Sequence, residues 1–88
     1  MFYILICLKR ECCGIDIMDM VAGMTDGRVV IGPGTLYTLL GDFEKQGIIR
    51  ETAVEGRKRS YRITEAGQKM LDDEYARLKQ LVVDYEKN

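Results

Sequence analysis

The pattern of apolar and polar residues divides the chain into helical and extended segments. Residues 2–8 are continuously apolar, and the polar stretch after them reads as a turn, so we expect a buried first helix there. A second helix is expected to begin at Gly14 and to end at the turn signal of residues 26–27. The apolar positions of this second helix recur at helical spacing and predict its core face: Ile15, Met18 and Val21 or Ala22.

The third helix is marked at both ends. Pro33 suits the first turn of a helix, where no amide hydrogen bond is lost, and Gly47 supplies the left-handed residue that ends one. Four apolar residues between them fall at i, i+3, i+4 and i+7 and predict the core face: Leu36, Leu39, Leu40 and Phe43. The opposite face carries Gly34, Thr38, Gly41 and Lys45, with Tyr37 and Asp42 on its flank. We therefore expect a helix from Pro33 to about Gln46.

After Gly47 the pattern changes to that of β-strands. Residues 48–54 are β-branched and partly alternating, Glu55-Gly56 is a turn, and residues 57–64 alternate. The alternation places Arg59, Tyr61 and Ile63 on one face of the returning strand and Lys58, Ser60 and Arg62 on the other. The segment is therefore predicted to be a β-hairpin with a basic returning strand.

A last helix is expected from the N-cap Thr64 towards Glu86. Its apolar residues step by four and three positions, like the seam of a coiled coil; this stripe either covers the chain's own core or meets a partner. A helix over residues 65–88 would be about 36 Å long, more than a domain of this size can cover, so we expect the distal half to pack against a second copy. The predicted dimer interface consists of Phe2, Tyr3, Leu71, Tyr75, Leu78, Val82 and Tyr85.

The composition is that of one soluble globular domain. The 88 residues are 47% hydrophobic and 31% charged, and a chain of this length cannot support two separate cores. No apolar run approaches the roughly 18 to 20 residues that cross a bilayer. The apolar start also lacks the flanks of a signal peptide, so a cytoplasmic protein without membrane contact is expected.

The net charge of −1 conceals a local concentration of basic residues. Residues 48–64 hold five basic and two acidic side chains, whereas the segments on either side are acidic. Contact with a polyanion depends on local charge, so this segment predicts an interaction with nucleic acid. The alternative is a solvated hairpin whose charges only prevent strand pairing at its edge.

The sequence lacks the residue combinations of common catalytic and metal sites. The chain has no histidine, which removes the commonest general base, and no nucleophile-base pair is visible, so no catalytic residues and no enzyme activity are expected. Three cysteines without a fourth ligand predict neither a zinc site nor another metal or cofactor. We expect Cys7 to be buried and Cys12 and Cys13 to lie in a turn; a thiol sensor at Cys12 or Cys13 is the alternative.

Three helices followed by a basic hairpin and a long helix describe a winged helix-turn-helix, a mainly helical α+β fold. Residues 1–64 would form the DNA-binding domain with a two-stranded wing, and residues 65–88 the dimerisation helix, within one structural unit. The third helix would lie in the major groove and the wing against the phosphate backbone. Two alternatives stay open: the glycines near Pro33 only shape a turn, and Tyr37 packs on the second helix. The predicted DNA-binding residues are Gly34, Thr35, Tyr37, Thr38, Arg57, Lys58, Arg59 and Arg62.

Three stretches of the sequence resemble the PadR family of transcriptional regulators: "GIDIM", "GPGTLYTLLGDFEKQGIIRE" and "EGRKRSYRITEAG". The resemblance implies a homodimeric winged-helix repressor that binds a palindromic operator in double-stranded DNA, with the last helix as dimerisation arm. It also implies a small aromatic or drug-like effector. Gly41 and Asp42 stand where many relatives carry basic residues, and this motivates the rival hypothesis of a protein-interaction module without DNA binding.

Overall fold

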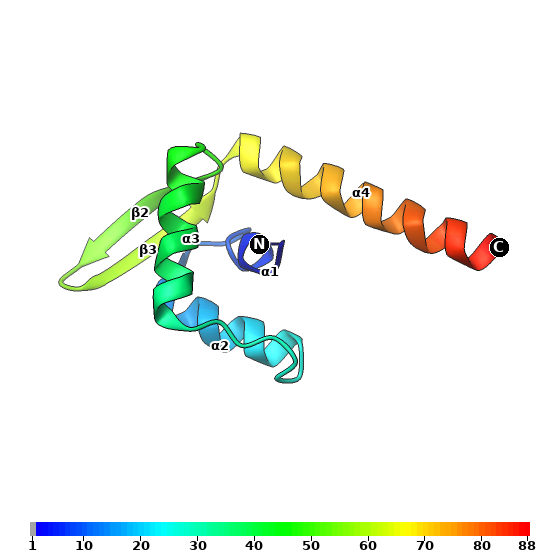
Figure 1. Cartoon of the computed structure of the whole chain (residues 1–88). Helices are drawn as coiled ribbons and strands as arrows, with labels where there is room; N and C mark the ends of the chain where they lie inside the picture. The colour runs from blue at the N-terminus through cyan, green and yellow to red at the C-terminus, as the bar shows by residue number, and fades with distance from the viewer. Residues whose placement is uncertain (1) are drawn as a thin grey trace.

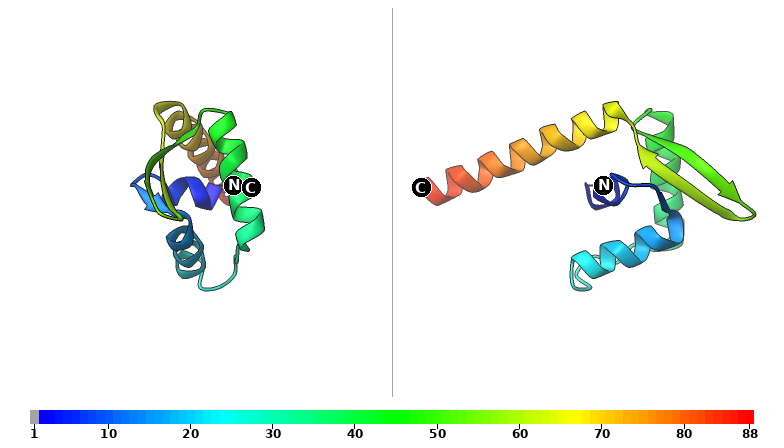
Figure 2. Two further views of the ribbon diagram at one scale, coloured as in Figure 1. Left: turned by 90° about the vertical axis from the view of Figure 1, so that its left-hand side faces the viewer. Right: turned by 180° about the vertical axis from the view of Figure 1, so that it is seen from behind.

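The computed structural model describes residues 2–88, which form four helices and a three-stranded antiparallel sheet (Figure 1). Three helices and the sheet form a compact body from which the last helix projects, so the molecule measures 53 × 29 × 19 Å (Figure 2). The elements in chain order are α1 (Phe2–Cys7), β1 (Cys12–Cys13), α2 (Gly14–Met24), α3 (Pro33–Lys45), β2 (Ile49–Glu55), β3 (Lys58–Ile63) and α4 (Glu65–Lys87). The predicted mainly helical winged-helix fold is confirmed.

The ends of α3 follow from its sequence. Pro33 occupies the first helical position after the extended Gly32, and Gly47 has a φ of 75°. At the C-terminal end, the amide of Gly47 donates to the carbonyl of Glu44 (3.0 Å) and that of Ile48 to the carbonyl of Phe43 (3.1 Å). This pair of bonds is a Schellman motif, which satisfies the last carbonyls of the helix and sends the chain directly into β2.

The sheet has one strand more than the sequence predicts. Its order is β1-β3-β2, because Cys12 pairs with Tyr61 and Cys13 with Ser60. The expectation that these two cysteines lie in a turn was therefore wrong. The predicted two-stranded hairpin of β2 and β3 is present, and β1 adds a third strand to the sheet at Tyr61 and Ser60. A strand of two residues carries no periodicity, and its pairing partner lies almost fifty residues away along the chain.

The hairpin contains a β-bulge that changes its register. Glu55 pairs with Lys58 across the two-residue loop of Gly56 and Arg57, and Ala53 pairs with Ser60. The next pair is Glu51 with Tyr61, so Thr52 is an extra residue in β2. Each pair beyond the bulge is displaced by one residue from the register that the loop alone would set.

The core contains apolar residues of all four helices and of the sheet. In α2 the buried positions are Ile17 and Val21, whereas Ile15 is 58% exposed and Met18 is only partly buried. The predicted core face of this helix was wrong at Ile15, because α1 and α3 determine which side of α2 is covered. On α3 the prediction was confirmed: Leu36, Leu40 and Phe43 are buried and Leu39 packs at the margin.

The loop from α2 to α3 is held by a buried threonine. Thr25 Oγ1 donates a hydrogen bond to the carbonyl of Val21 (2.8 Å) and accepts one from the amide of Val29 (3.1 Å). Asp26 and Gly27 both have positive φ and form the predicted turn. These bonds fix the point from which the chain enters α3.

The long helix α4 is attached to the body by its first turns. Thr64 is its N-cap, as predicted, and accepts a hydrogen bond from the amide of Gly67 (3.1 Å). The buried residues of α4 are Gly67 and Leu71, and beyond them the helix extends away from the body (Figure 1). Within residues 2–88, no helix combines the length and the apolar character needed to cross a membrane.

Candidate nucleic-acid interface

The outer face of α3 is open and carries short side chains. Gly34, Thr35 and Thr38 are exposed, on the side of the helix opposite the buried Leu36 and Leu40. A Cβ added at Gly34 would meet nothing within 4 Å, and this glycine does not have a positive φ. The fold therefore does not require glycine at this position, and the interpretation as a turn-shaping residue is not supported for Gly34. Its absent side chain lets another molecule approach the first turn of the helix closely.

Tyr37 packs on α2 and also keeps part of its side chain at the surface. Its ring packs on the beginning of α2, where a Cβ at Gly14 would lie 3.1 Å from the Tyr37 hydroxyl and from Cε1. The side chain nevertheless remains 47% exposed. Tyr37 thus fixes the contact between α2 and α3 and still presents surface beside the threonines of the outer face.

The wing projects beside α3 as a thin two-stranded ribbon (Figure 2). Gly56, with a φ of 61°, allows the tight turn at its tip, and the four basic residues predicted to bind DNA are all exposed: Arg57, Lys58, Arg59 and Arg62. Arg59 lies 3.6 Å from the carboxylate of Glu51 and so already has a counter-ion. The other three form no ion pair within residues 2–88.

The inner face of the wing is joined to the core through Tyr61. This side chain is 3% exposed, and burial, with the carboxylates of Glu44 and Glu51, raises the pKa of its phenol above the ordinary value. Tyr61 therefore stays neutral and holds β3 against the body. By anchoring β3, Tyr61 sets the position of the wing relative to α3.

Negative charge also borders this surface. Asp42 and Glu44 are exposed on α3, and Glu55 lies opposite Lys58 in the hairpin. The positive charge is thus concentrated on the wing, while the outer face of α3 carries a single cation, Lys45, near its C-terminal end and the Asp42 carboxylate on its flank. Arg50 of β2 is a further exposed cation that the sequence analysis counted in the basic segment but did not assign to the interface.

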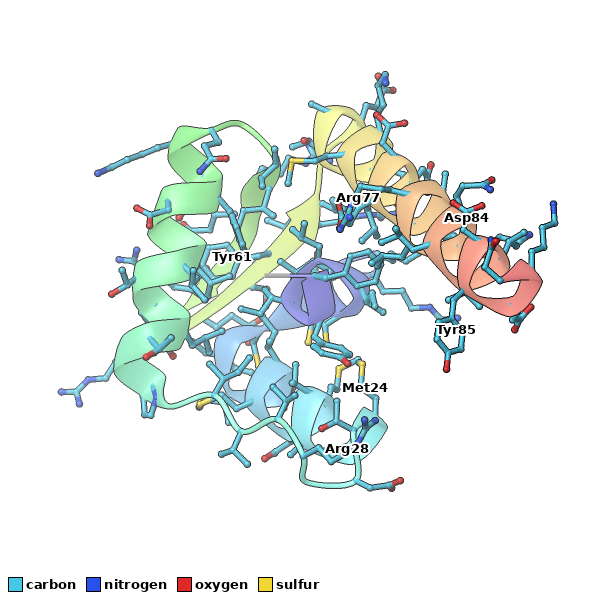
Figure 3. The ribbon with its side chains drawn as sticks, turned by 45° about the vertical axis from the view of Figure 1, so that its right-hand side comes forward. Met24, Arg28, Tyr61, Arg77, Asp84 and Tyr85 are labelled. Carbon is cyan, nitrogen blue, oxygen red and sulfur yellow. The ribbon has the colours of Figure 1, made fainter. Side chains whose placement is uncertain are left out.

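A second surface lies on the distal half of α4. Tyr75, Leu78, Val82 and Tyr85, which the sequence assigns to a dimer interface, are exposed in the single chain, and Leu81 adds to this apolar surface. Leu81 was missed because it lies beside the main seam, although its position three residues after Leu78 was a usable signal. Figure 3 shows Tyr85 projecting from the far end of the helix.

The remaining predicted interface residues lie closer to the body. Leu71 is only 5% exposed and packs into the core of its own chain, while Phe2 and Tyr3 are partly buried against that core. Charged residues of α4 pair along the helix, with Lys69 Nζ 2.8 Å from Asp73 Oδ2 and Arg77 bonded to Glu74. The arm therefore carries an exposed apolar stripe beside charged side chains that are partly paired with one another.

The three cysteines do not form a reactive centre. Cys7 and Cys13 are buried, and the Cys13 thiol donates to Asp16 Oδ2 (3.1 Å). Burial, reinforced by the Asp16 carboxylate and the neighbouring thiols, raises the pKa of Cys12 to about 11. Cys12 is therefore a protonated, weakly nucleophilic thiol at neutral pH, which opposes a thiol sensor at this residue. No group of three or more metal-binding side chains is present in the described part of the chain.

Comparison with known proteins identifies relatives of the whole arrangement. Residues 4–73 match the family described as transcriptional regulator PadR-like. A transcriptional regulator from Clostridium thermocellum is 30% identical, with a TM-score of 0.79 over 96% of this chain and 88% of that one. None of the curated proteins matches the chain.

Two further solved structures share the fold at lower identity. A PadR family regulator from Eggerthella lenta is 24% identical, with a TM-score of 0.79 over 98% of this chain and 77% of that one. A PadR-like transcription factor from Bacteroides fragilis is 23% identical, with a TM-score of 0.80 over 97% and 84%. At these identities the likeness concerns the fold alone.

Proposed function

The chain belongs to the PadR-like family of transcriptional regulators, and we propose that it is a cytoplasmic homodimeric repressor that binds a palindromic DNA operator. PadR-like proteins are DNA-binding regulators and not enzymes. The observation that carries the proposal is that the outer face of α3, which is open and has short side chains, lies beside an exposed basic wing. The helix offers its first turn to the major groove, and the wing offers cations to the backbone.

In this proposal the wing supplies most of the affinity. Among the described residues, Arg57, Lys58 and Arg62 have no carboxylate partner, so each is available to neutralise a phosphate. Gly34, Thr35, Tyr37 and Thr38 form the part of α3 that approaches the bases. Arg59 belongs to the predicted set as well, but its contact with Glu51 competes with any phosphate.

Residues 1–64 serve as the DNA-binding domain and the distal part of residues 65–88 as the dimerisation helix. The exposed apolar seam of α4 supports this division, because a single chain leaves it uncovered. A two-fold axis along the paired helices would set two copies of α3 about 34 Å apart, one turn of DNA. Such a dimer requires a palindromic operator.

We also propose that a small aromatic or drug-like effector binds beside the dimerisation helix. The support is a hollow of about 230 Å³ between α1 and α4, lined by Phe2, Leu5, Met70, Leu71 and Glu74. Its walls are apolar with one carboxylate, which suits a flat molecule with a cationic or donor group. Tyr3, Tyr75 and Tyr85 would supply further aromatic surface in a dimer.

The experiment that tests the proposal is a selection from random double-stranded DNA, followed by fluorescence anisotropy at several salt concentrations. We expect an inverted repeat with half-sites about one helical turn apart, and an affinity that falls steeply with salt. A variant with Arg57 and Lys58 both changed to Gln should bind more weakly and with a shallower salt dependence. If no sequence is enriched and binding is insensitive to these changes, the interaction-module hypothesis replaces the repressor.

A further inference from the structure

Two arginines lie directly opposite one another at the base of the wing. Arg50 of β2 and Arg62 of β3 are Cα partners in the antiparallel ladder, and both are exposed. Within residues 2–88, neither forms an ion pair. Like charges in direct opposition destabilise a sheet unless an anion lies between them.

The bulge at Thr52 creates this opposition. In the register set by the loop, with Ala53 opposite Ser60, Glu51 would have faced Arg62 and the two could have paired. The extra residue moves Arg50 into that place instead and puts Glu51 opposite Tyr61. Glu51 then approaches Arg59, at 3.6 Å, on the other face of the hairpin. The bulge thus places a carboxylate beside Arg59, whereas Arg50 and Arg62 have no counter-ion within residues 2–88.

The arginine pair borders an open hollow. Both side chains line a space of about 610 Å³ at the junction of α3, the wing and α4, together with Gly47, Ile63, Thr64, Glu65 and Ala66. A guanidinium presents a planar fork of donors that matches the oxygens of a phosphate, and two forks can share one phosphate. The Glu65 carboxylate is the one acidic group that lines this hollow, and it opposes an anion there.

The pair also continues the basic face of the wing. Lys58 and Arg62 lie on the same face of β3, about 13 Å apart along the strand. A DNA backbone that runs along this face places more than one phosphate within that length. A backbone that follows this face from the tip of the wing therefore reaches the arginine pair.

We propose that Arg50 and Arg62 together hold one backbone phosphate of the operator, and that Arg59 holds none. This inference rests on the proposed DNA-binding function. It adds Arg50 to the interface and removes Arg59, although both are exposed arginines of the same hairpin. The wing then contacts DNA along one face, from its tip to its base.

The test is the salt dependence of operator binding by the full chain, measured by anisotropy for single Arg50→Gln and Arg62→Gln variants, their double variant and a matched Arg59→Gln control. The slope of log K against log salt is negative, and the double variant should make it less steep by about 0.9 per half-site, the value for one lost phosphate contact. Two separate phosphate contacts would make it less steep by about 1.8. Arg59→Gln should leave the slope unchanged. Glu65→Gln should tighten binding.

The outcomes separate this inference from the function on which it rests. Operator binding with an unchanged slope in the double variant, or a slope lowered only by Arg59→Gln, overturns the arginine pair and leaves the repressor intact. Absence of sequence-specific binding by the unmodified chain overturns the proposed function and the pair with it. Circular dichroism and thermal unfolding of each variant verify that the hairpin is folded.

Discussion

Gly67 of α4 lies so close to the backbone carbonyl of Ile48 that a Cβ on residue 67 would stand 2.0 Å from that oxygen. The same carbonyl accepts a hydrogen bond from the amide of Thr64 (3.0 Å). The start of the long helix is thus fitted directly against the backbone that leaves α3. This contact joins the arm to the compact body, and the glycine is required by the space available and not by its φ.

Gly67→Ala is expected to lower the free energy of unfolding by about 3 kcal/mol, in the upper range for overpacking, because backbone must move to admit the methyl group. Urea denaturation measures the change. Gly23→Ala in α2 is the matched control, since a Cβ there would meet nothing within 4 Å. The control should be neutral or more stable by up to about 1 kcal/mol. Equal effects in the two variants would contradict the close contact.

Thr64→Ala should destabilise the chain by about 1 kcal/mol, because α4 loses its N-cap. The Thr64 hydroxyl accepts from the amide of Gly67 and donates to the carbonyl of Gly47 (2.7 Å), so the loss also loosens the end of α3. Thr64→Ser keeps the hydroxyl and should retain most of the stability. Urea unfolding of both variants distinguishes the lost hydroxyl from the lost methyl group.

Gly34→Ala should affect stability and DNA binding in opposite directions. The fold has room for the methyl group, so stability should be unchanged or rise by about 0.5 kcal/mol. If DNA approaches the first turn of α3 closely, operator affinity should fall about tenfold, the equivalent of about 1.4 kcal/mol. Thermal unfolding and anisotropy on the same preparation measure the two effects. Unchanged affinity would remove Gly34 from the proposed interface.

Leu78→Asp should convert the proposed dimer into a monomer, because a carboxylate in a helix seam loses several kcal/mol of hydration without a partner. Sedimentation of the intact chain at micromolar concentration measures this. Ala76 directly follows the seam residue Tyr75 and lies on the outer side of the arm. The Ala76→Asp variant carries the same added charge and should remain dimeric. A monomeric unmodified chain would refute the dimerisation helix.

Cys12 should react slowly with iodoacetamide at neutral pH. Because its pKa is raised to about 11, the thiolate fraction should still be rising tenfold per pH unit between pH 8 and 10. An ordinary cysteine, with a pKa near 8.5, would approach its maximum rate in that range. Peptide mass spectrometry after timed labelling locates the modification. A rate that levels off below pH 9 would contradict a buried, protonated thiol and restore the thiol-sensor alternative.

The sequence by itself determined the features that depend on neighbouring residues. Pro33, Gly47 and Thr64 set helix ends through local hydrogen bonds, and the leucines of α3 set its buried face by their spacing. The change of period after Gly47 and the concentration of basic residues identified the wing. The resemblance to the PadR family could be identified from the sequence because its three motifs occur in the family's order, and each motif covers one of these local features.

Only the tertiary structure decided the features that join distant segments. The pairing of Cys12 with Tyr61, the burial of Ile17 in place of Ile15 and the contact of Gly67 with Ile48 all depend on which elements meet. The opposition of Arg50 and Arg62 depends on a bulge that the sequence does not mark. A single extra residue shifts every later pair in a ladder, so the partners of the wing arginines depend on the register and not on the order of residues along the chain.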